Sequence, residues 1–174
     1  MSRVVVLGDL NLDVVVSEAP EPRPGAEVRG SVQVAAGGSA GTFARVAASL
    51  GARVVFLGAV GRDAAADILE RSLVDVGVES RLLRSEAPSG TVVAMRRGNE
   101  RSMICSRGAN DDLDAKWVDA HWPLGVDHLH VSGYALLAEG PRAAARCAIA
   151  YAATSGASVS LDPPPASLIA AFGA

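Results

Sequence analysis

Short runs rich in apolar residues alternate with helical patterns along most of the chain. The runs predict buried strands over residues 3–7, 53–60, 127–132 and 158–161. Apolar positions at helical spacing predict helices over residues 39–50, 64–76, 141–154 and 166–172. Asp63 fits the N-cap of the second helix, while Gly51 and Gly77 fit the positions just beyond the ends of the first two. This alternation predicts an α/β fold with a mainly parallel sheet covered by helices.

Two segments do not fit this rhythm. Residues 14–35 contain a stretch in which polar and apolar side chains alternate, and residues 91–106 read as two strands joined by a polar turn at 97–100. Prolines between residues 20 and 25 indicate a loop inside the first segment. We expect the two segments to pair into a small antiparallel sheet that stands off the central layer, because a two-stranded ribbon alone is only marginally stable.

Composition limits the classes of function that the chain can have. The 174 residues suit one α/β domain or part of a larger one, with an aliphatic core because only 4% are aromatic. A net charge of −3 without a basic tract gives no indication of nucleic acid or a membrane surface as a partner. No signal peptide or membrane-spanning stretch is evident, so we expect a cytoplasmic protein. Cys105 and Cys147 are far apart, which favours isolated thiols over a disulfide or a metal site.

Four short motifs give the chain a resemblance to a known family. They are Gly-Asp-Leu-Asn-Leu-Asp at 8–13, Gly-Gly-Ser-Ala-Gly-Thr-Phe-Ala at 37–44, Gly-Ala-Val-Gly-Arg-Asp at 58–63, and Glu-Arg-Ser at 100–102 followed by Arg-Gly-Ala-Asn at 107–110. Each motif alone is weak, but together and in this order they resemble the N-terminal portion of PfkB (ribokinase-type) carbohydrate kinases. The chain departs from the family at Thr42, where an asparagine is usual.

The resemblance implies a ribokinase-like three-layer α/β/α fold with the C-terminal half missing, in which residues 14–35 and 91–106 form a small antiparallel β lid. The implied reaction transfers the γ-phosphoryl group of ATP, with Mg²⁺, to a hydroxyl of a small sugar or sugar derivative. The family's Gly-Ala-Gly-Asp motif, whose aspartate is the general base, does not occur in the sequence. We therefore expect no catalytic residue in this chain, an ATP site largely outside it, and no kinase activity from the chain alone.

Other interpretations stay open. A catalytically inactive, truncated sugar-binding or dimerising fragment would carry the same motifs. The predicted lid would exclude water from the reaction, or it would be a surface ribbon that buries only a dimer face. The resemblance implies that lids often do both, so we expect a homodimer through the lid. A nucleotide-binding oxidoreductase domain is disfavoured, because GxGxxG is absent and a β-ribbon interrupts the alternation of strands and helices.

The strongest candidates for substrate binding lie in the first two motifs. Asp13 follows the first strand, near the sheet edge where open α/β sheets bind ligands, and a carboxylate accepts charge-assisted hydrogen bonds from hydroxyls. The resemblance implies that Asp13 grips the sugar, with Asn11 as a weaker ligand. Gly37 and Gly38 precede a helix N-terminus, where free amides favour polar or anionic groups, although a tight turn would also require glycine. Thr42 offers a hydroxyl in the first turn of that helix.

Further candidates lie in the second half of the chain. The planar guanidinium of Arg107 could hold a carboxylate or phosphate, although a surface arginine is more common. Tyr134, just past the strand at 127–132, is a candidate for lining the sugar pocket. His128 and His130 point to the same side of that strand, but no third ligand is evident, so we interpret them as core or pocket-lining residues and predict no metal site.

Overall fold

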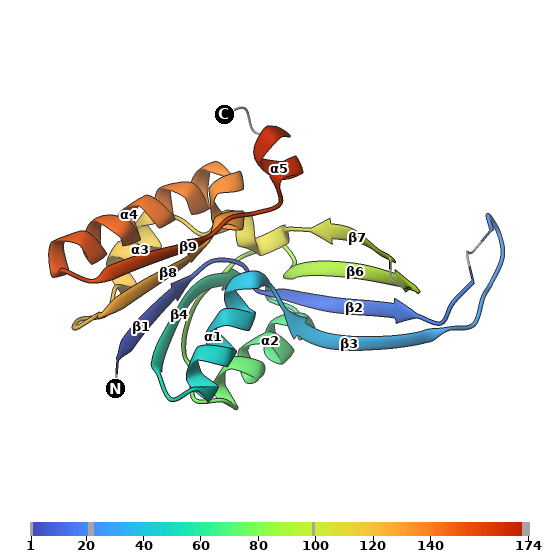
Figure 1. Ribbon diagram of the computed structural model, residues 1–174, viewed down its shortest axis with the longest axis horizontal. Helices are drawn as coiled ribbons and strands as arrows, with labels where there is room; N and C mark the ends of the chain where they lie inside the picture. Colours follow the sequence, from blue (N-terminus) through green and yellow to red (C-terminus); the bar gives the residue numbers. More distant parts are fainter. Residues whose placement is uncertain (1, 21–22, 99, 172–174) are drawn as a thin grey trace.

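The computed structural model describes residues 2–20, 23–98 and 100–171, which form two β-sheets and a set of helices (Figure 1). Glu21, Pro22, Asn99 and Phe172 belong to a loop, a turn and a helix predicted from the sequence, and they lie outside the described residues. Among the described helices, none is long and apolar enough to cross a membrane.

The larger sheet has five parallel strands in the order β5-β4-β1-β8-β9. Their bounds are Arg3–Leu7 for β1, Arg53–Val60 for β4, Glu79–Arg84 for β5, His128–Ser132 for β8 and Ser158–Asp162 for β9. In the centre of the sheet Val5 pairs with Val55 on one side and with Leu129 on the other. The parallel sheet predicted from the sequence is confirmed, and β5 is an additional strand at its edge.

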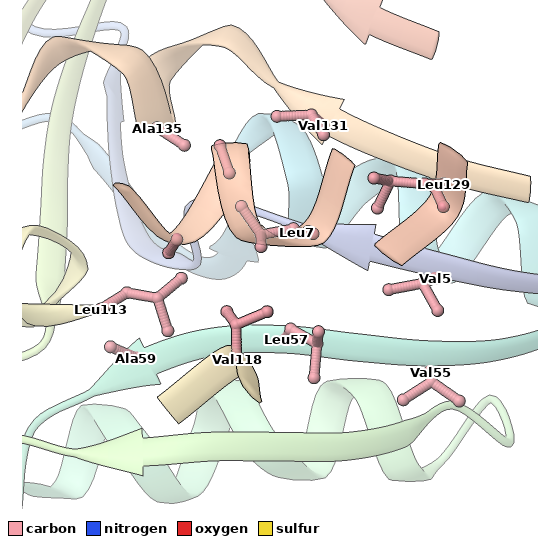
Figure 2. Packing of buried hydrophobic residues seen from close by; sticks show 14 of the residues in the cluster. Val5, Leu7, Val55, Leu57, Ala59, Leu113, Val118, Leu129, Val131 and Ala135 are labelled. Carbon is pink, nitrogen blue, oxygen red and sulfur yellow. The ribbon is translucent and has the colours of Figure 1, made fainter. Parts of the chain in front are cut away.

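Helices cover both faces of this sheet (Figure 1). Their bounds are Ser39–Ser49 for α1, Ala64–Val74 for α2, Ala115–His121 for α3, Glu139–Ser155 for α4 and Ala166–Ala171 for α5, with 3₁₀ helices η1 at Gly108–Asp112 and η2 at Gly133–Leu137. Because side chains alternate along a strand, Val5 and Leu7 pack toward α4 while Val4 and Val6 pack toward α1 and α2. Figure 2 shows the first of these two cores. The three-layer α/β/α architecture is thereby confirmed.

Local sequence explains where the helices begin and end. Asp63 caps α2 as predicted, because its Oδ1 accepts a hydrogen bond of 2.9 Å from the Ala66 amide. Gly51 follows the end of α1 with φ +91°, a left-handed conformation that suits glycine. Asp114 caps α3 in the same way through the Trp117 amide at 2.7 Å, although this helix was not predicted from the sequence.

The smaller sheet contains the two segments that broke the sequence pattern, and we call it the lid. Its order is β3-β2-β6-β7, with bounds Ser31–Gly37 for β3, Asn11–Ser17 for β2, Gly90–Arg97 for β6 and Glu100–Ser106 for β7. Figure 1 shows it as a separate sheet beside the central layer, as expected.

The lid is a mixed sheet, so the prediction of an antiparallel lid was wrong in one respect. Strands β2 and β3 pair antiparallel, as do β6 and β7, but β2 and β6 run parallel. The reason is topological: β2 follows β1 and β6 follows β5, and parallel strands all end at the same edge of the central sheet. Both lid strands therefore leave that edge in the same direction, and each is followed by a strand that returns.

Candidate functional site

Asp9 lies in the short link between β1 and β2 and is buried, with 5% of its surface exposed. Its carboxylate accepts hydrogen bonds from the Ser39 amide at 2.8 Å and the Ser132 hydroxyl at 2.7 Å, and a longer one of 3.3 Å from Asn11 Nδ2. These bonds join the carboxyl ends of β1 and β8 to the start of α1. Sequence reasoning gave Asp9 no role, but a signal existed: α1 begins after Gly38, which offers no side-chain cap, so its first amides need an acceptor from elsewhere.

The N-terminus of α1 is consequently occupied by the protein itself. Asp9 accepts from the amides of Ser39, at 2.8 Å, and of Ala40, at 3.5 Å. Those two amides are therefore not free to bind an anionic ligand. A contact of Gly37 or Gly38 with a ligand stays a prediction. The protein itself accounts for Gly38, because its φ is +88° and an added Cβ would come within 2.5 Å of the Asp9 carbonyl oxygen.

Asp13 lies inside β2, at the base of the lid, and is half-buried. Its carboxylate covers Gly37, where an added Cβ would come within 2.2 Å of Oδ2. Burial raises the pKa of Asp13, and the nearby charges of Arg101 and Arg45 oppose that rise. In the part of the chain that the structure describes, no group donates a hydrogen bond to this carboxylate. It is therefore a partly desolvated acceptor with free lone pairs.

Asn11 lies between two polar partners. Its Oδ1 accepts a hydrogen bond of 2.8 Å from Asn110 Nδ2, and its Nδ2 donates to Asp9 at 3.3 Å. Gly90 makes this arrangement possible, because a Cβ there would lie 2.1 Å from Asn110 Nδ2 and 2.2 Å from Asn11 Oδ1. These bonds hold Asn11 in place two residues before Asp13 on β2.

Thr42 is exposed on the first turn of α1, and its hydroxyl is engaged by an arginine. Arg45 Nη2 donates to Thr42 Oγ1 at 3.2 Å and to the Ala36 carbonyl at 2.9 Å. Arg45 Nη1 is buried and has no hydrogen-bond partner among the residues described. Arg45 was not singled out from the sequence; its position one turn beyond Thr42 on the same helix face was the available signal.

Arg107 and Tyr134 complete the set of predicted residues. Arg107 Nε forms an ion pair with Asp111 Oδ1 at 2.6 Å, so a residue of η1 already neutralises its charge. Tyr134, in η2, is partly buried, and burial together with the negative charge of Asp9 raises the pKa of its phenol. Arg107 is also close enough to Tyr134 to lower that pKa. The two side chains therefore lie within electrostatic reach of each other at the same end of the central sheet.

The two histidines are held by hydrogen bonds and packing. His128 Nε2 and His130 Nδ1 both contact Ser160 Oγ, at 2.8 and 2.9 Å, and His130 stacks on Phe43 with ring centroids 3.6 Å apart. Burial lowers the pKa of His130. Within residues 2–20, 23–98 and 100–171, no group of three His, Cys, Asp or Glu side chains is placed to hold a metal ion.

The structure therefore brings part of the predicted site together. Asp13, Asn11, Gly37 and Gly38 adjoin one another where the lid meets the central sheet, and Arg101 joins them from β7. Carboxylate oxygens at such a place can accept hydrogen bonds from the hydroxyls of a small polyhydroxylated molecule.

Comparisons with known proteins show which family and fold the chain resembles. The model of the pfkB family of carbohydrate kinases matches residues 1–172. A ribokinase from Bacillus subtilis (strain 168) is 32% identical over 116 residues, which cover 65% of this chain and 40% of that protein. The chain thus spans less than half the length of this relative.

Solved structures support the same fold. The structure of a ribokinase from Giardia lamblia superposes with a TM-score of 0.83 at 19% identity, covering 95% of this chain and 56% of that one. A putative ribokinase II from E. coli, in complex with ATP and Mg²⁺, superposes with a TM-score of 0.81 at 23% identity and covers 94% and 53% of the two chains. At these identities the likeness shows the fold, and this chain corresponds to about half of each structure.

Proposed function

Because the chain belongs to the pfkB family of carbohydrate kinases, we propose that it forms the acceptor-binding part of an ATP-dependent kinase that phosphorylates a hydroxyl of a small sugar or sugar derivative. The acceptor binds where the lid meets the central sheet. Asp13 accepts hydrogen bonds from sugar hydroxyls, and Asn11, Gly37 and Gly38 lie beside it. Thr42, Arg107 and Tyr134 are assigned to the rim of the same site.

The observation that carries this proposal is the state of the Asp13 carboxylate. It is half-buried, covers Gly37, and receives no hydrogen bond from any described residue. Asp9, four residues earlier, differs from Asp13, because its carboxylate accepts hydrogen bonds from backbone amides of α1 and from the Ser132 hydroxyl. Burial weakens the hydration of the Asp13 carboxylate, as its raised pKa indicates, so the donors of a bound ligand would replace weakly held water. Sugar hydroxyls are suitable donors.

In this proposal the chain's own residues bind, orient and shield the acceptor. Asp13 fixes one part of the sugar, and the lid covers it, which keeps water from competing as the phosphoryl acceptor. The family implies use of ATP with Mg²⁺, which supplies the phosphoryl group and neutralises its charge. The described residues offer no acidic cluster for the metal, so we assign neither group to a residue of this chain.

A second role for the lid rests on the face opposite to Asp13. Val32, Val34 and Ile104 are 62%, 56% and 64% exposed and, by the strand register, share that face with Val14 and Val93. Aliphatic side chains exposed together across strands are typical of a surface that another protein covers. We propose that this face pairs with the lid of a second copy of the chain.

The alternative is an inactive sugar-binding or dimerising fragment, and it shares the same acceptor site. The absence of the Gly-Ala-Gly-Asp motif from the sequence favours it for the isolated chain, because that motif supplies the general base in relatives. Both versions require sugar binding by Asp13, and they differ in whether ATP is consumed.

Isothermal titration calorimetry of the chain with ribose, fructose, gluconate and adenosine tests the acceptor site. For the sugar that binds, Asp13→Ala should weaken affinity by about ten-fold or more, since each charge-assisted hydrogen bond contributes roughly 1.5–3 kcal/mol. The melting temperature should barely change, because the side chain has no described protein partner. Asp67→Ala, on the exposed side of α2, is the matched control. Equal affinity of the wild type and Asp13→Ala would refute the assignment.

A further inference from the structure

Arg45, in α1, connects two elements that meet at the acceptor site. Its Nη2 donates to the Ala36 carbonyl of β3 at 2.9 Å and to Thr42 Oγ1 of α1 at 3.2 Å. Ala36 directly precedes Gly37, which the Asp13 carboxylate covers. The guanidinium group therefore bridges the turn between β3 and α1, next to the segment on which the proposed sugar ligand lies.

The guanidinium group of Arg45 is partly desolvated and incompletely paired. Its Nη1 is buried and has no hydrogen-bond partner among the residues that the structure describes. Burial lowers the pKa of Arg45, and the negative charge of Asp13 opposes that fall. The same two charges act in the other direction, because Arg45 helps to oppose the rise that burial imposes on the pKa of Asp13. The arginine and the aspartate therefore stabilise each other's charged forms.

The hydrogen bond from Arg45 leaves the Thr42 hydroxyl free to donate. An arginine side chain has only N–H donors, so Thr42 Oγ1 is the acceptor in this bond. A hydroxyl that accepts one bond still has its own O–H proton, and no described residue accepts that proton. Because Thr42 is exposed on the first turn of α1, the proton is available to a ligand. The site thus offers a hydroxyl donor in addition to the carboxylate acceptor of Asp13.

We propose that Arg45 is a positioning residue of the acceptor site, which directs the Thr42 hydroxyl proton to an oxygen of the bound sugar while its own charge faces Asp13. This inference rests on the proposed function and adds to it a donor that complements the carboxylate. Arg45 is buried at Nη1 and engaged at Nη2, so it acts through Thr42 and Asp13 and not by contact with the sugar.

A double-mutant cycle on sugar binding tests the link between Arg45 and Thr42. Calorimetry measures the affinity for whichever of ribose, fructose, gluconate and adenosine the chain binds. Thr42→Val removes the hydroxyl and keeps the shape, and Arg45→Gln removes the charge and the planar fork. Each alone should weaken binding by about three- to ten-fold, the range expected for one hydrogen bond. In the Thr42→Val background Arg45→Gln should have a much smaller effect, because the hydroxyl that it positions is gone.

The pH dependence of binding gives a second readout, which a merely structural role of Arg45 would not move. Burial raises the pKa of Asp13, the charges of Arg101 on β7 and of Arg45 lower it, and Asp9 raises it. Without the charge of Arg45, Asp13 should become protonated at a higher pH. As the pH is lowered from 7 to 4, affinity should therefore begin to fall at a higher pH in Arg45→Gln than in the wild type, while Arg45→Lys should follow the wild type.

Two further variants keep the test interpretable. Arg71→Gln changes an exposed arginine in the last turn of α2 and is the matched control, so it should alter neither the affinity nor its pH dependence. If melting curves show Arg45→Gln unfolded at the assay temperature, Arg45→Lys replaces it in the cycle. Lysine keeps the charge but lacks the planar fork that reaches both Ala36 and Thr42, so its effect should also shrink in the Thr42→Val background.

The outcomes separate this inference from the proposed function. Effects of Arg45 and Thr42 substitutions that simply add overturn the inference, and they leave the sugar site standing if Asp13→Ala still weakens binding. If Asp13→Ala leaves the affinity unchanged, the proposed grip of Asp13 on the sugar fails, and the coupling between Arg45 and Thr42 alone decides this inference. No binding of any tested sugar overturns both.

Discussion

Replacing Asp9 by alanine should destabilise the fold more than most single substitutions. The change removes the acceptor of two short hydrogen bonds, from the Ser39 amide at 2.8 Å and the Ser132 hydroxyl at 2.7 Å. Hydrogen bonds to a charged group contribute roughly 1.5–3 kcal/mol each, so the two together amount to about 3–6 kcal/mol. The bonds of 3.5 Å from Ala40 and 3.3 Å from Asn11 are too long to add much.

Two effects make the expected loss of stability smaller than this sum of hydrogen-bond free energies. The variant no longer buries a carboxylate, which itself costs free energy, and water can reach part of the vacated space. We therefore expect Asp9→Ala to lower the free energy of unfolding by about 2–4 kcal/mol, a large share of the roughly 5–15 kcal/mol typical of a domain. Asp9→Asn keeps the shape but turns an amide NH₂ toward at least one donor, so it should also be destabilised.

Urea denaturation followed by circular dichroism measures this loss. The matched control is Asp114→Ala, which removes an exposed cap of α3 that accepts one hydrogen bond, from the Trp117 amide at 2.7 Å. Loss of such a cap costs about 1 kcal/mol. If Asp9→Ala loses no more stability than Asp114→Ala, the carboxylate does not join the three elements in the way we describe.

Other predictions concern the acceptor site and the lid. Gly37→Ala should weaken sugar binding by displacing the Asp13 carboxylate, since its Cβ would come within 2.2 Å of Oδ2; calorimetry giving unchanged affinity would contradict this. Burial raises the pKa of Asp13 above its ordinary 3.8, and only the ionised carboxylate accepts hydrogen bonds on all its lone pairs. As the pH is lowered from 7 to 4, sugar affinity should therefore begin to fall at a higher pH than it would for an ordinary aspartate, which calorimetric titrations across this range would reveal. Ile104→Asp should shift any dimer toward monomer in analytical ultracentrifugation, because Ile104 is 64% exposed on the proposed pairing face; a dimer unaffected by it would use another surface. The purified chain with ATP, Mg²⁺ and the sugar that it binds should release no ADP above a control without sugar, and turnover near 1 s⁻¹, within the usual range for kinases, would reveal a base that the sequence motifs do not indicate.

The sequence predicted most of the central layer because its signals are local. Apolar runs, several of them followed by glycine, identified four of the five strands of the central sheet. The exception is β5, because its sequence Glu-Ser-Arg-Leu-Leu-Arg contains too many charged residues to be recognised as a buried strand. An edge strand has one exposed side, so its pattern is weaker. Helix α3 was missed because seven residues are too few to display a helical period.

Long-range features of the site were less predictable. Whether β2 and β6 would run parallel depends on where each strand leaves the body, and no local pattern encodes that pairing. The motifs placed Asp13 near Gly37, and the structure shows that the two are neighbours. Residue type did not indicate that the protein would bind the carboxylate of Asp9 and leave that of Asp13 without a donor. Two aspartates four positions apart differ because the amides of α1 fold against one of them only.

The hydrogen bonds made by the side-chain amide of Asn110 have a consequence for motion of the lid. Its side chain behaves like a stretch of backbone: Oδ1 accepts from the Leu10 amide at 2.9 Å, and Nδ2 donates to the Leu10 carbonyl at 3.3 Å. Leu10 is completely buried and lies between two strands rather than inside one. Its amide proton should therefore exchange with solvent as slowly as those of the central strands. The first residues of β2 are then anchored to the body, so the lid would open by bending further along β2 and β6 and not by swinging about its base.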